Sequence, residues 1–316
     1  MSKSLRVVFM GTPAFAVAGL RGIIQSHHKV VGVVTTPDRP SGRGKKIQFS
    51  AVKEEALFHN LSLLQPEKLG TQKTIDDLKA LEADVFVVVA FRMLPKTIWS
   101  IPTLGTFNLH ASLLPQYRGA APIHWAVING EKETGLTTFL IDEKIDTGSL
   151  LLQKKLAIGE GETTGELSAR MAELSGSMIV ETLDALSKGK IIPKPQSNDK
   201  GLLSAPKLTR ENTRIDWGAA GQHIVHFIHG LNPFPSAWSI LELPNEELYV
   251  KLKRAHFVTG NPIHPPGRVF IEDKQLSVSV SDGYVFIDTL QLPNKKSMET
   301  PALLNGYRFP EKCRFV

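Results

Sequence analysis

The first half of the chain alternates short apolar runs with segments whose apolar residues recur at helical spacing. The runs cover residues 5–10, 30–36 and 83–91, and the last of them, ADVFVVVAF, is the strongest signal of a buried strand. Between the first two, AFAVAGLRGIIQSH has the spacing of a helix. This alternation predicts an α/β fold with a doubly wound, mostly parallel sheet and helices on both faces.

After the stretch TFNLH the pattern changes to an antiparallel pair and one long helix. TTFLID and SLLLQKKLAI are typical of two strands, joined by the turn DEKIDTG. An amphipathic helix is expected over about residues 164–188, with Thr163 or Thr164 capping its start and Gly189 just past its end. These elements complete a first domain, predicted at residues 1–189.

Residues 190–208 interrupt this regular pattern. They read KIIPKPQSNDKGLLSAPKL, with three prolines, many polar residues and little periodicity, which indicates a linker between domains. Short strands separated by turns such as Asp282-Gly283 follow. This pattern is typical of a small closed or partly open barrel, so residues 209–316 are predicted to form an OB-like β-barrel domain, a fold that often binds nucleic acid.

Composition narrows the class of protein. The chain has 316 residues, of which 42% are hydrophobic and 22% charged, as in ordinary globular proteins of two domains. Apolar runs are too short to cross a bilayer, and the first residues do not resemble a secretory signal. Cys313 is the one cysteine, which excludes internal disulfides and multi-cysteine metal sites and makes a cytoplasmic location the simplest expectation.

The net charge of the chain does not by itself indicate a polyanionic partner, but the clustering of basic residues along the sequence does. The net charge of +6 is explained as well by a solvated basic surface. Residues 39–46, however, read RPSGRGKK and contain no acid, and Gly42 and Gly44 allow the backbone around Arg43 to approach a partner closely. A solvated basic loop is the alternative interpretation.

Three other features favour structural roles. The turn GTPAFA lacks the glycines of the dinucleotide fingerprint, and Pro13 has no backbone N–H for a pyrophosphate, so NAD binding is not expected. His223, His226 and His229 spread over a broad helix face, which favours a partly exposed face over a metal site. Cys313 has no obvious base nearby, so a structural or surface thiol is expected rather than a nucleophile.

The strand at residues 106–110, TFNLH, carries the strongest chemical signal. Asn108 and His110 are two apart, so their side chains point to one face, at the carboxyl end where open α/β sheets bind ligands. A buried pair satisfied by hydrogen bonds accounts for these two residues equally well. Asp146 in the turn IDTG adds a third polar residue, with Asp142 as its competitor in the same loop.

This trio predicts chemistry in which the substrate supplies the nucleophile. No serine or cysteine stands beside it, because Ser112 lies in the loop that follows the strand. Asn108 and His110 would stabilise an oxyanion, and Asp146 would orient the histidine or take a proton. The arrangement fits acyl transfer.

At these residues a resemblance to a known family becomes plain. The stretch at residues 108–122, NLHASLLPQYRGAAP, resembles the signature of the folate-dependent formyltransferase family, and IDTG resembles the Asp-Thr-Gly turn of that family. Further segments, VFMGTPAFA, TTPDRPSGRGKK, PIHWAV, KLTRENTRIDW and LNPFPSAW, resemble the branch that acts on methionyl-tRNA. The resemblance covers nearly the whole chain.

The resemblance implies a function and a set of site residues. It implies a Rossmann-like catalytic domain and a tRNA-binding barrel. The implied reaction takes 10-formyltetrahydrofolate as formyl donor and initiator methionyl-tRNA as acceptor, in bacterial translation initiation. A metal is not expected, and the protein is expected to be a monomer. Asn108, His110 and Asp146 match the catalytic positions of the family. The folate-contacting positions are matched by Ser112, Leu113, Leu114 and Pro115. The tRNA-contacting positions are matched by Arg43, Lys45 and Lys46. Residues 91–95, FRMLP, depart from the Tyr-Gly-x-x-Leu-Pro pattern common in the family, so no pterin contact is assigned there.

Two alternatives stay open at this point. One is an enzyme of the same chemistry with a small amine acceptor, such as an amino-sugar nucleotide, against which the basic loop and the barrel argue. The other is an RNA-binding protein with an inactive folate-like domain, against which the intact Asn108, His110 and Asp146 argue. Formyl transfer to charged initiator tRNA separates these possibilities.

Overall fold

A computed structural model describes residues 3–41, 46–197 and 200–316. The chain divides into two compact units: unit 1 comprises Met1–Gly119, Thr134–Leu156 and Ser168–Ser204, and unit 2 comprises Ala120–Glu133, Ala157–Leu167 and Ala205–Val316. Each unit therefore draws on several stretches of the chain. The division predicted from the sequence, with a linker at residues 190–208, stays a prediction.

Unit 1 is built on a seven-stranded sheet with the order β10-β9-β7-β6-β1-β2-β5. Its strands are β1 (Arg6–Gly11), β2 (Lys29–Val34), β5 (Leu63–Leu64), β6 (Val85–Val89), β7 (Thr106–His110), β9 (Glu133–Leu140) and β10 (Leu150–Ala157). Neighbours from β5 to β7 pair in parallel, and β9 is antiparallel to β7. This confirms the predicted α/β class with a mostly parallel sheet.

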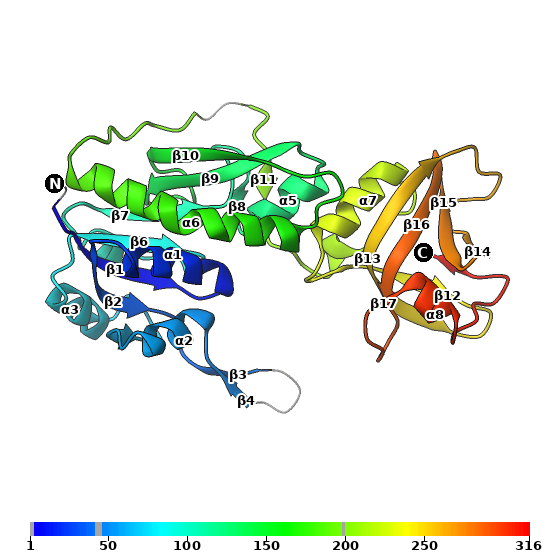
Figure 1. The fold of residues 1–316 in the computed structure, drawn as a ribbon, viewed down its shortest axis with the longest axis horizontal. Helices are drawn as coiled ribbons and strands as arrows, with labels where there is room; N and C mark the ends of the chain where they lie inside the picture. Colours follow the sequence, from blue (N-terminus) through cyan, green and yellow to red (C-terminus); the bar gives the residue numbers. More distant parts are fainter. Residues whose placement is uncertain (1–2, 42–45, 198–199) are drawn as a thin grey trace. The chain divides into compact units, whose positions relative to one another are not determined.

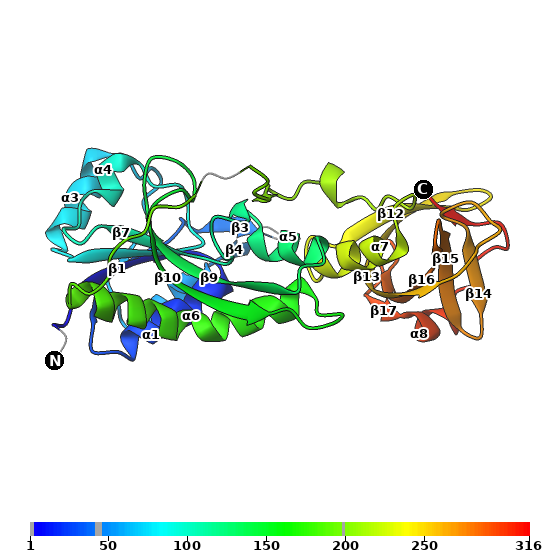
Figure 2. The same ribbon diagram turned by 90° about the horizontal axis from the view of Figure 1, so that it is seen from above.

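Helices cover both faces of this sheet. The helices of the unit 1 region are α1 (Ala14–Ile24), α2 (Ala51–Phe58), α3 (Gln72–Ala80), α4 (Lys96–Trp99) and α6 (Thr164–Ser187). Figure 2 shows α1 and α6 on one side of the strands and α3 and α4 on the other. All five residues of β6 are buried, which explains why this strand reads as an unbroken apolar run.

The long helix begins and ends where the sequence predicts. The backbone N–H of Thr163 donates to Glu166 Oε2 at 2.9 Å, and the Glu166 N–H reaches Thr163 Oγ1 at 3.4 Å. This reciprocal pair is a capping box, which satisfies two N–H groups that the first turn leaves open. Gly189 has φ +61°, the left-handed conformation that commonly terminates a helix.

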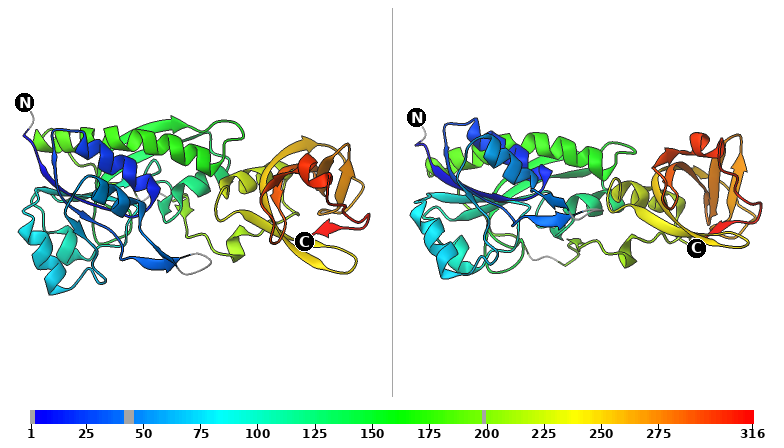
Figure 3. Two further views of the ribbon diagram at one scale, coloured as in Figure 1. Left: turned by 60° about the horizontal axis from the view of Figure 1, so that its bottom comes forward. Right: turned by 90° about the horizontal axis from the view of Figure 1, so that it is seen from below.

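Unit 2 contains a nearly closed antiparallel barrel, as predicted (Figures 1 and 3). Its strands are β12 (Ala237–Glu242), β13 (Glu247–Thr259), β14 (Val269–Glu272), β15 (Gln275–Val280), β16 (Gly283–Gln291), β17 (Met298–Glu299) and β18 (Arg314–Phe315). A single bridge between Arg268 and Arg314 brings the edges at β14 and β18 together. Further elements of the described residues are β8 (Arg118–Gly119), α5 (Pro122–Ile128), β11 (Ser204–Ala205), the 3₁₀ turn Glu211–Thr213, α7 (Gly221–Gly230) and α8 (Thr300–Leu304).

The basic segment forms a structure that the sequence did not predict. β3 (Arg39–Ser41) pairs antiparallel with β4 (Lys46–Gln48). Arg43 and Lys45 lie outside the described residues, and of Lys46 only the backbone is described. Within the described ranges, no helix has the length and apolarity that a membrane crossing requires.

The histidines of α7 do not converge on one point. His223 is exposed, and the His226 ring contacts Gln222 at 2.9 Å, as expected for a partly exposed face. His229 departs from that prediction, because it is buried and its Nε2 accepts the N–H of Ala255 at 3.4 Å. Cys313 is also buried, and burial raises the pKa of its thiol, in agreement with a structural role.

We expect the protein to lose stability in mild acid because of its buried histidines. Burial lowers the pKa of His28 and His229 from the ordinary value of 6.5. As the pH falls below about 6.5 the unfolded chain takes up protons first, so the free energy of unfolding decreases, by about 1.4 kcal/mol per unit of lowered pKa. Urea unfolding at pH 7.5, 6.5 and 5.5 measures this slope. His229→Gln should flatten it and the exposed His223→Gln should not; equal slopes in all three proteins would contradict the prediction.

Candidate active site

β7 delivers two polar side chains to the carboxyl edge of the sheet in unit 1. Asn108 lies between Val88 on β6 and Phe139 on β9, and His110 pairs with Thr137 on β9. Phe107 and Leu109, which alternate with Asn108 and His110 along β7, are apolar and buried, so packing against neighbouring elements fixes the strand in place. Its last residues therefore present an amide and an imidazole where open α/β sheets bind their ligands.

His110 is held in one orientation by the backbone. Its Nε2 lies 2.9 Å from the carbonyl oxygen of Tyr117, and only 6% of the side chain is exposed. A carbonyl oxygen only accepts, so Nε2 carries a hydrogen. The other ring nitrogen, Nδ1, faces Asp146 Oδ2 at 3.8 Å, which is an ion-pair distance but too long for a hydrogen bond.

The turn at residues 146–148 brings Asp146, and not Asp142, to the histidine. Asp146 has φ +56°, and its Oδ2 accepts the N–H of Gly119 at 2.9 Å. A Cβ on Gly148 would lie 1.7 Å from the carbonyl oxygen of Leu140, so only glycine fits there. Asp142 is exposed and accepts from Thr147 Oγ1 at 2.8 Å within its own turn.

Asn108 has an unused hydrogen-bonding group. Its Oδ1 is buried and has no hydrogen-bond partner among the described residues. A buried polar atom without a partner costs free energy, so such atoms are rare in folded proteins unless a ligand or water meets them. This favours a functional role over the alternative of a pair satisfied within the fold.

The loop after β7 is shaped by two buried residues. Ser112 donates to the carbonyl oxygen of Gln116 at 2.6 Å, and the N–H of Leu114 donates to Thr137 Oγ1 at 3.2 Å. Gln153 adds a bond from Nε2 to the carbonyl oxygen of Leu114 at 2.8 Å. Ser112 and Leu114 thus define the loop's conformation.

The neighbouring Leu113 and Pro115 are half-buried and have side-chain surface to offer a ligand. A Cβ on Gly135 would lie 2.5 Å from the Leu113 side chain, so Leu113 packs closely on β9. The folate contacts expected at Ser112, Leu113, Leu114 and Pro115 stay predictions. The geometry favours contacts from the side chains of Leu113 and Pro115 and from the loop backbone.

The base of the β3–β4 hairpin is held by a polar cluster that the sequence analysis missed. Asp38 Oδ2 accepts from Lys53 Nζ at 2.5 Å, and Asp38 Oδ1 accepts from Gln65 Nε2 at 2.9 Å. These hydrogen bonds lower the pKa of Asp38. Lys53 is buried on α2, so the carboxylate compensates a charge that would otherwise be costly. No spacing in the sequence indicates this cluster.

The loop at residues 91–95, which departs from the pattern expected for the family, is braced by Arg92. Arg92 donates from Nη2 to the carbonyl oxygen of Pro66 at 2.8 Å and from Nη1 to that of Glu67 at 3.1 Å. Burial lowers the pKa of its guanidinium. The departure from the family pattern therefore has a structural basis, because the arginine ties this loop to the segment after β5.

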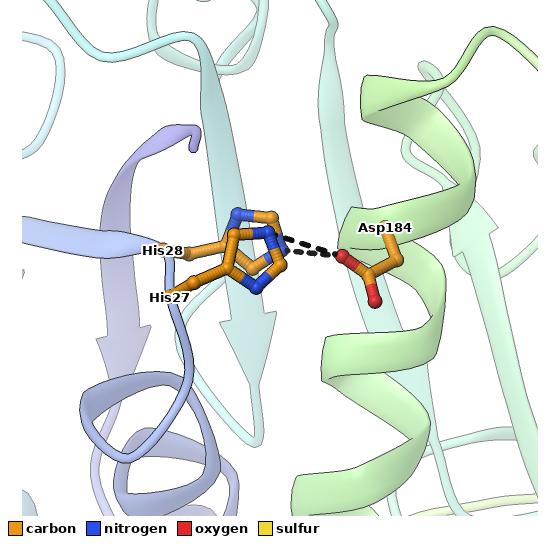
Figure 4. A group of neighbouring side chains, drawn as sticks. All are labelled: His27, His28 and Asp184. Atoms are coloured by element: carbon orange, nitrogen blue, oxygen red, sulfur yellow. Dashed lines mark ion pairs between the residues drawn. The ribbon is translucent and has the colours of Figure 1, made fainter. Parts of the chain in front are cut away.

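A cluster of His27, His28 and Asp184 forms a second polar group in unit 1 (Figure 4). The Nε2 atoms of both histidines lie 3.3 Å from Asp184 Oδ1. However, His28 Nδ1 accepts the N–H of Leu5 at 3.1 Å, so the hydrogen of the neutral ring sits on Nε2. A metal would need the lone pair of that nitrogen, so we interpret the cluster as a tie between the turn before β2 and α6.

Two family models cover most of the chain. The model described as "Formyl transferase" matches residues 5–183, and the model described as "Formyl transferase, C-terminal domain" matches residues 207–308. Among solved structures, HypX from Aquifex aeolicus in complex with tetrahydrofolic acid has a TM-score of 0.63 at 18% identity, covering 96% of this chain and 47% of HypX. WlaRD, a sugar 3N-formyl transferase, has a TM-score of 0.62 at 18% identity, covering 93% and 100%. These two share the fold.

Closer relatives resemble the chain from end to end. A protein of Flavobacterium johnsoniae named methionyl-tRNA formyltransferase is 46% identical over 312 residues, which cover 99% of each chain. One of the same name from Bacteroides fragilis is 46% identical over 319 residues, covering 98% of this chain and 97% of the relative. On this identity and coverage, the chain belongs to the methionyl-tRNA formyltransferase family.

Proposed function

We propose that Asn108, His110 and Asp146 catalyse transfer of the formyl group of 10-formyltetrahydrofolate to the α-amine of methionyl initiator tRNA. The products are N-formylmethionyl-tRNA, which serves translation initiation, and tetrahydrofolate. Family membership supports the reaction. The observation that carries the assignment of residues is the buried Asn108 Oδ1 without a hydrogen-bond partner among the described residues, beside a histidine that is aligned by Tyr117 and faces Asp146.

The reaction needs stabilisation of negative charge on the formyl oxygen. The amine attacks the formyl carbon, a C–N bond forms, and the oxygen becomes an oxyanion. The bond from that carbon to N10 of the folate then breaks, while the amine loses a proton and N10 gains one. The Nδ2–H of Asn108 and the Nδ1–H of a protonated His110 would donate to the oxyanion, and such donors commonly provide the largest share of catalysis. The Asn108 Oδ1, which has no partner among the described residues, would accept an N–H of the attacking amine.

Asp146 would compensate the positive charge on His110. The Tyr117 carbonyl already accepts from Nε2, so Nδ1 is the ring nitrogen that can exchange a proton or donate to the substrate. At 3.8 Å from Nδ1, Asp146 Oδ2 stabilises the charge of the imidazolium without a hydrogen bond, so the Nδ1–H stays available to the oxyanion. The steps written above use side chains of one chain and are written without a metal.

A folate donor agrees with the loop after β7. Leu113 and Pro115 offer apolar surface beside the trio, as a planar pterin or its linker requires. The solved complex of HypX with tetrahydrofolic acid is in line with a folate on this fold. An amino-sugar nucleotide as acceptor has weaker support, because WlaRD is only 18% identical to this chain.

Incubating the protein with 10-formyltetrahydrofolate and charged initiator tRNA tests the function directly. We expect N-formylmethionine on the tRNA and release of tetrahydrofolate. An amino-sugar nucleotide and charged elongator methionine tRNA serve as competing acceptors. Transfer to the sugar amine without transfer to tRNA would overturn the proposal.

Unit 2 has a surface suited to the tRNA. A pocket of about 470 Å³ is lined by Lys207, Arg210 and Lys251, together with Tyr249 and other residues. The Arg210 guanidinium lies 5.7 Å from the centroid of the Tyr249 ring. Cations beside an aromatic ring are typical of single-stranded nucleic acid sites, where phosphates meet the cations and bases stack on the ring. We propose that this pocket contributes to tRNA binding by the barrel.

The basic segment at residues 39–46 is proposed to read the acceptor end of the tRNA. Arg43→Ala should weaken use of initiator tRNA and reduce its preference over other tRNAs, because a planar guanidinium can contact a base edge or an unpaired end. Lys45→Ala and Lys46→Ala should weaken all tRNAs alike, each reducing the log–log salt slope by about 0.7–0.9. Initial rates against tRNA concentration at several salt levels, with folate saturating, measure both effects.

The controls use the same assay. The KM for 10-formyltetrahydrofolate should be unchanged in all three variants, because the substitutions change the basic segment at residues 39–46 and not the trio. Lys251→Ala in unit 2 should behave like the two lysine variants of this segment. Unchanged tRNA kinetics in Arg43→Ala, Lys45→Ala and Lys46→Ala would leave the segment as a solvated basic stretch.

A further inference from the structure

We propose that Gln196 is a positioning residue for formyl transfer, acting through Asp146. The inference rests on the catalytic role proposed for Asp146 and extends the machinery into the segment that the sequence predicts to be a linker. Gln196 Nε2 donates to the carbonyl oxygen of Asp146 at 2.9 Å and to that of Gly148 at 2.8 Å. A single side-chain amide therefore holds both ends of the turn that carries the carboxylate.

Every hydrogen-bonding group of the Gln196 amide has a partner. Its two N–H groups meet the two carbonyl oxygens, and its Oε1 accepts from Arg118 at 3.1 Å (Nε) and 2.8 Å (Nη2). An amide offers two donors and an oxygen with two lone pairs, so the bonding capacity of the group is met. Such saturation, in a half-buried residue, fixes the orientation of both partners.

Arg118 connects this clamp to the histidine. Three consecutive residues contact the site: the carbonyl oxygen of Tyr117 accepts from His110, the side chain of Arg118 binds Gln196, and the N–H of Gly119 donates to Asp146 Oδ2. Gln196 thus links the segment that aligns the imidazole to the turn that aligns the carboxylate. The relative position of the two is therefore set by this side chain together with the hydrogen bond from Gly119 to Asp146.

The turn needs such support because of its conformation. Asp146 has φ +56°, in the left-handed region that residues with a Cβ rarely occupy unless surrounding contacts hold them there. The backbone of the Gln196 segment is itself anchored, because Lys194 and Leu150 exchange two backbone hydrogen bonds of 2.8 and 2.9 Å at the start of β10. Without the amide, the turn can relax and change the distance between His110 and Asp146.

The test uses Gln196→Leu and Gln196→Glu. Leucine removes all the hydrogen bonds, whereas glutamate keeps the bond to Arg118 but turns oxygens toward the carbonyls of Asp146 and Gly148. We expect kcat to fall about 10- to 100-fold in both variants, since small displacements of catalytic groups have effects of this size. The KM values for tRNA and 10-formyltetrahydrofolate should stay nearly constant. Gln72→Leu, on the exposed side of α3, is the matched control and should retain full kcat.

A double-mutant cycle separates positioning from general structural support. In an Asp146→Asn background, Gln196→Leu should cause little further loss, because residues that act as a unit are not additive. An equal fold-loss in both backgrounds, or wild-type kcat in Gln196→Leu and Gln196→Glu, would overturn the inference. If Asp146→Asn itself retained activity, the proposed role of Asp146 would fail instead. If Gln196→Leu does not fold, Gln196→Glu and Arg118→Lys are compared in the same way, with and without Asp146→Asn.

Discussion

Replacing His110 by alanine or Asp146 by asparagine is expected to lower kcat of formyl transfer about 10²- to 10³-fold. Removing one group that stabilises a developing oxyanion typically costs about 2.7–4 kcal/mol of transition-state stabilisation. His110→Ala removes the donor itself, while Asp146→Asn keeps the shape of the turn and removes the negative charge that faces Nδ1 at 3.8 Å. Single-turnover rates with both substrates saturating report the chemical step without contributions from binding.

The matched control for this pair is Asp142→Asn, which changes a carboxylate in the same loop. Asp142 accepts hydrogen bonds from Thr147 and Lys144, and an asparagine oxygen can accept them as well. Its kcat should therefore stay near that of the parent protein. Equal losses in Asp142→Asn and Asp146→Asn, or near-parental turnover of His110→Ala with an intact circular dichroism spectrum, would remove the basis of the assignment.

Asn108→Leu is expected to move activity and stability in opposite directions. Leucine is similar in size but has no amide, so kcat should fall about 10²- to 10³-fold if Asn108 donates to the oxyanion. At the same time it removes a buried oxygen without a hydrogen-bond partner among the described residues, and relief of that penalty should raise the free energy of unfolding by about 1–3 kcal/mol. Kinetics and urea unfolding of the same preparation measure both quantities.

This opposition distinguishes a functional residue from a structural one. If Asn108 served the fold, Asn108→Leu would lower stability, and activity would fall only in proportion to the unfolded fraction. Asn108→Asp provides a second comparison, because it keeps the size and adds a negative charge beside the developing oxyanion. A stable Asn108→Asp protein with parental kcat would argue against the proposed donor.

Most of the fold was predictable from strong apolar patterns in the sequence. Residues 83–91 predict a buried strand, and β6 (Val85–Val89) is buried throughout, because burial on both faces leaves no position for a polar side chain. The start of α6 was predictable for a similar reason, since Thr163 and Glu166 form a local capping pair three residues apart. Local chemistry is visible in a sequence when its partners are close together in the chain.

Contacts between distant segments were not visible in the same way. The clamp of Asp38 by Lys53 and Gln65 joins positions whose spacing has no periodic meaning, and the segment around Gln196 has the composition of a linker although it is bonded to the turn of Asp146. Asn108 and His110 stood out because two residues on one strand share a face, whereas the orientation of the imidazole depends on the carbonyl of Tyr117, which any residue could supply.

The composition of unit 2 has a consequence for how the protein is made. Ile128 of α5 belongs to the same apolar core as the barrel, and a Cβ on Gly230 of α7 would lie 2.4 Å from its side chain. The two helices are far apart in sequence, so closing this contact must wait until a long stretch of chain has left the ribosome, and such non-local contacts form slowly. During synthesis the apolar face of α5 is therefore expected to remain uncovered until α7 and the barrel strands have been made, and in that interval it is exposed to non-native contacts with other apolar segments.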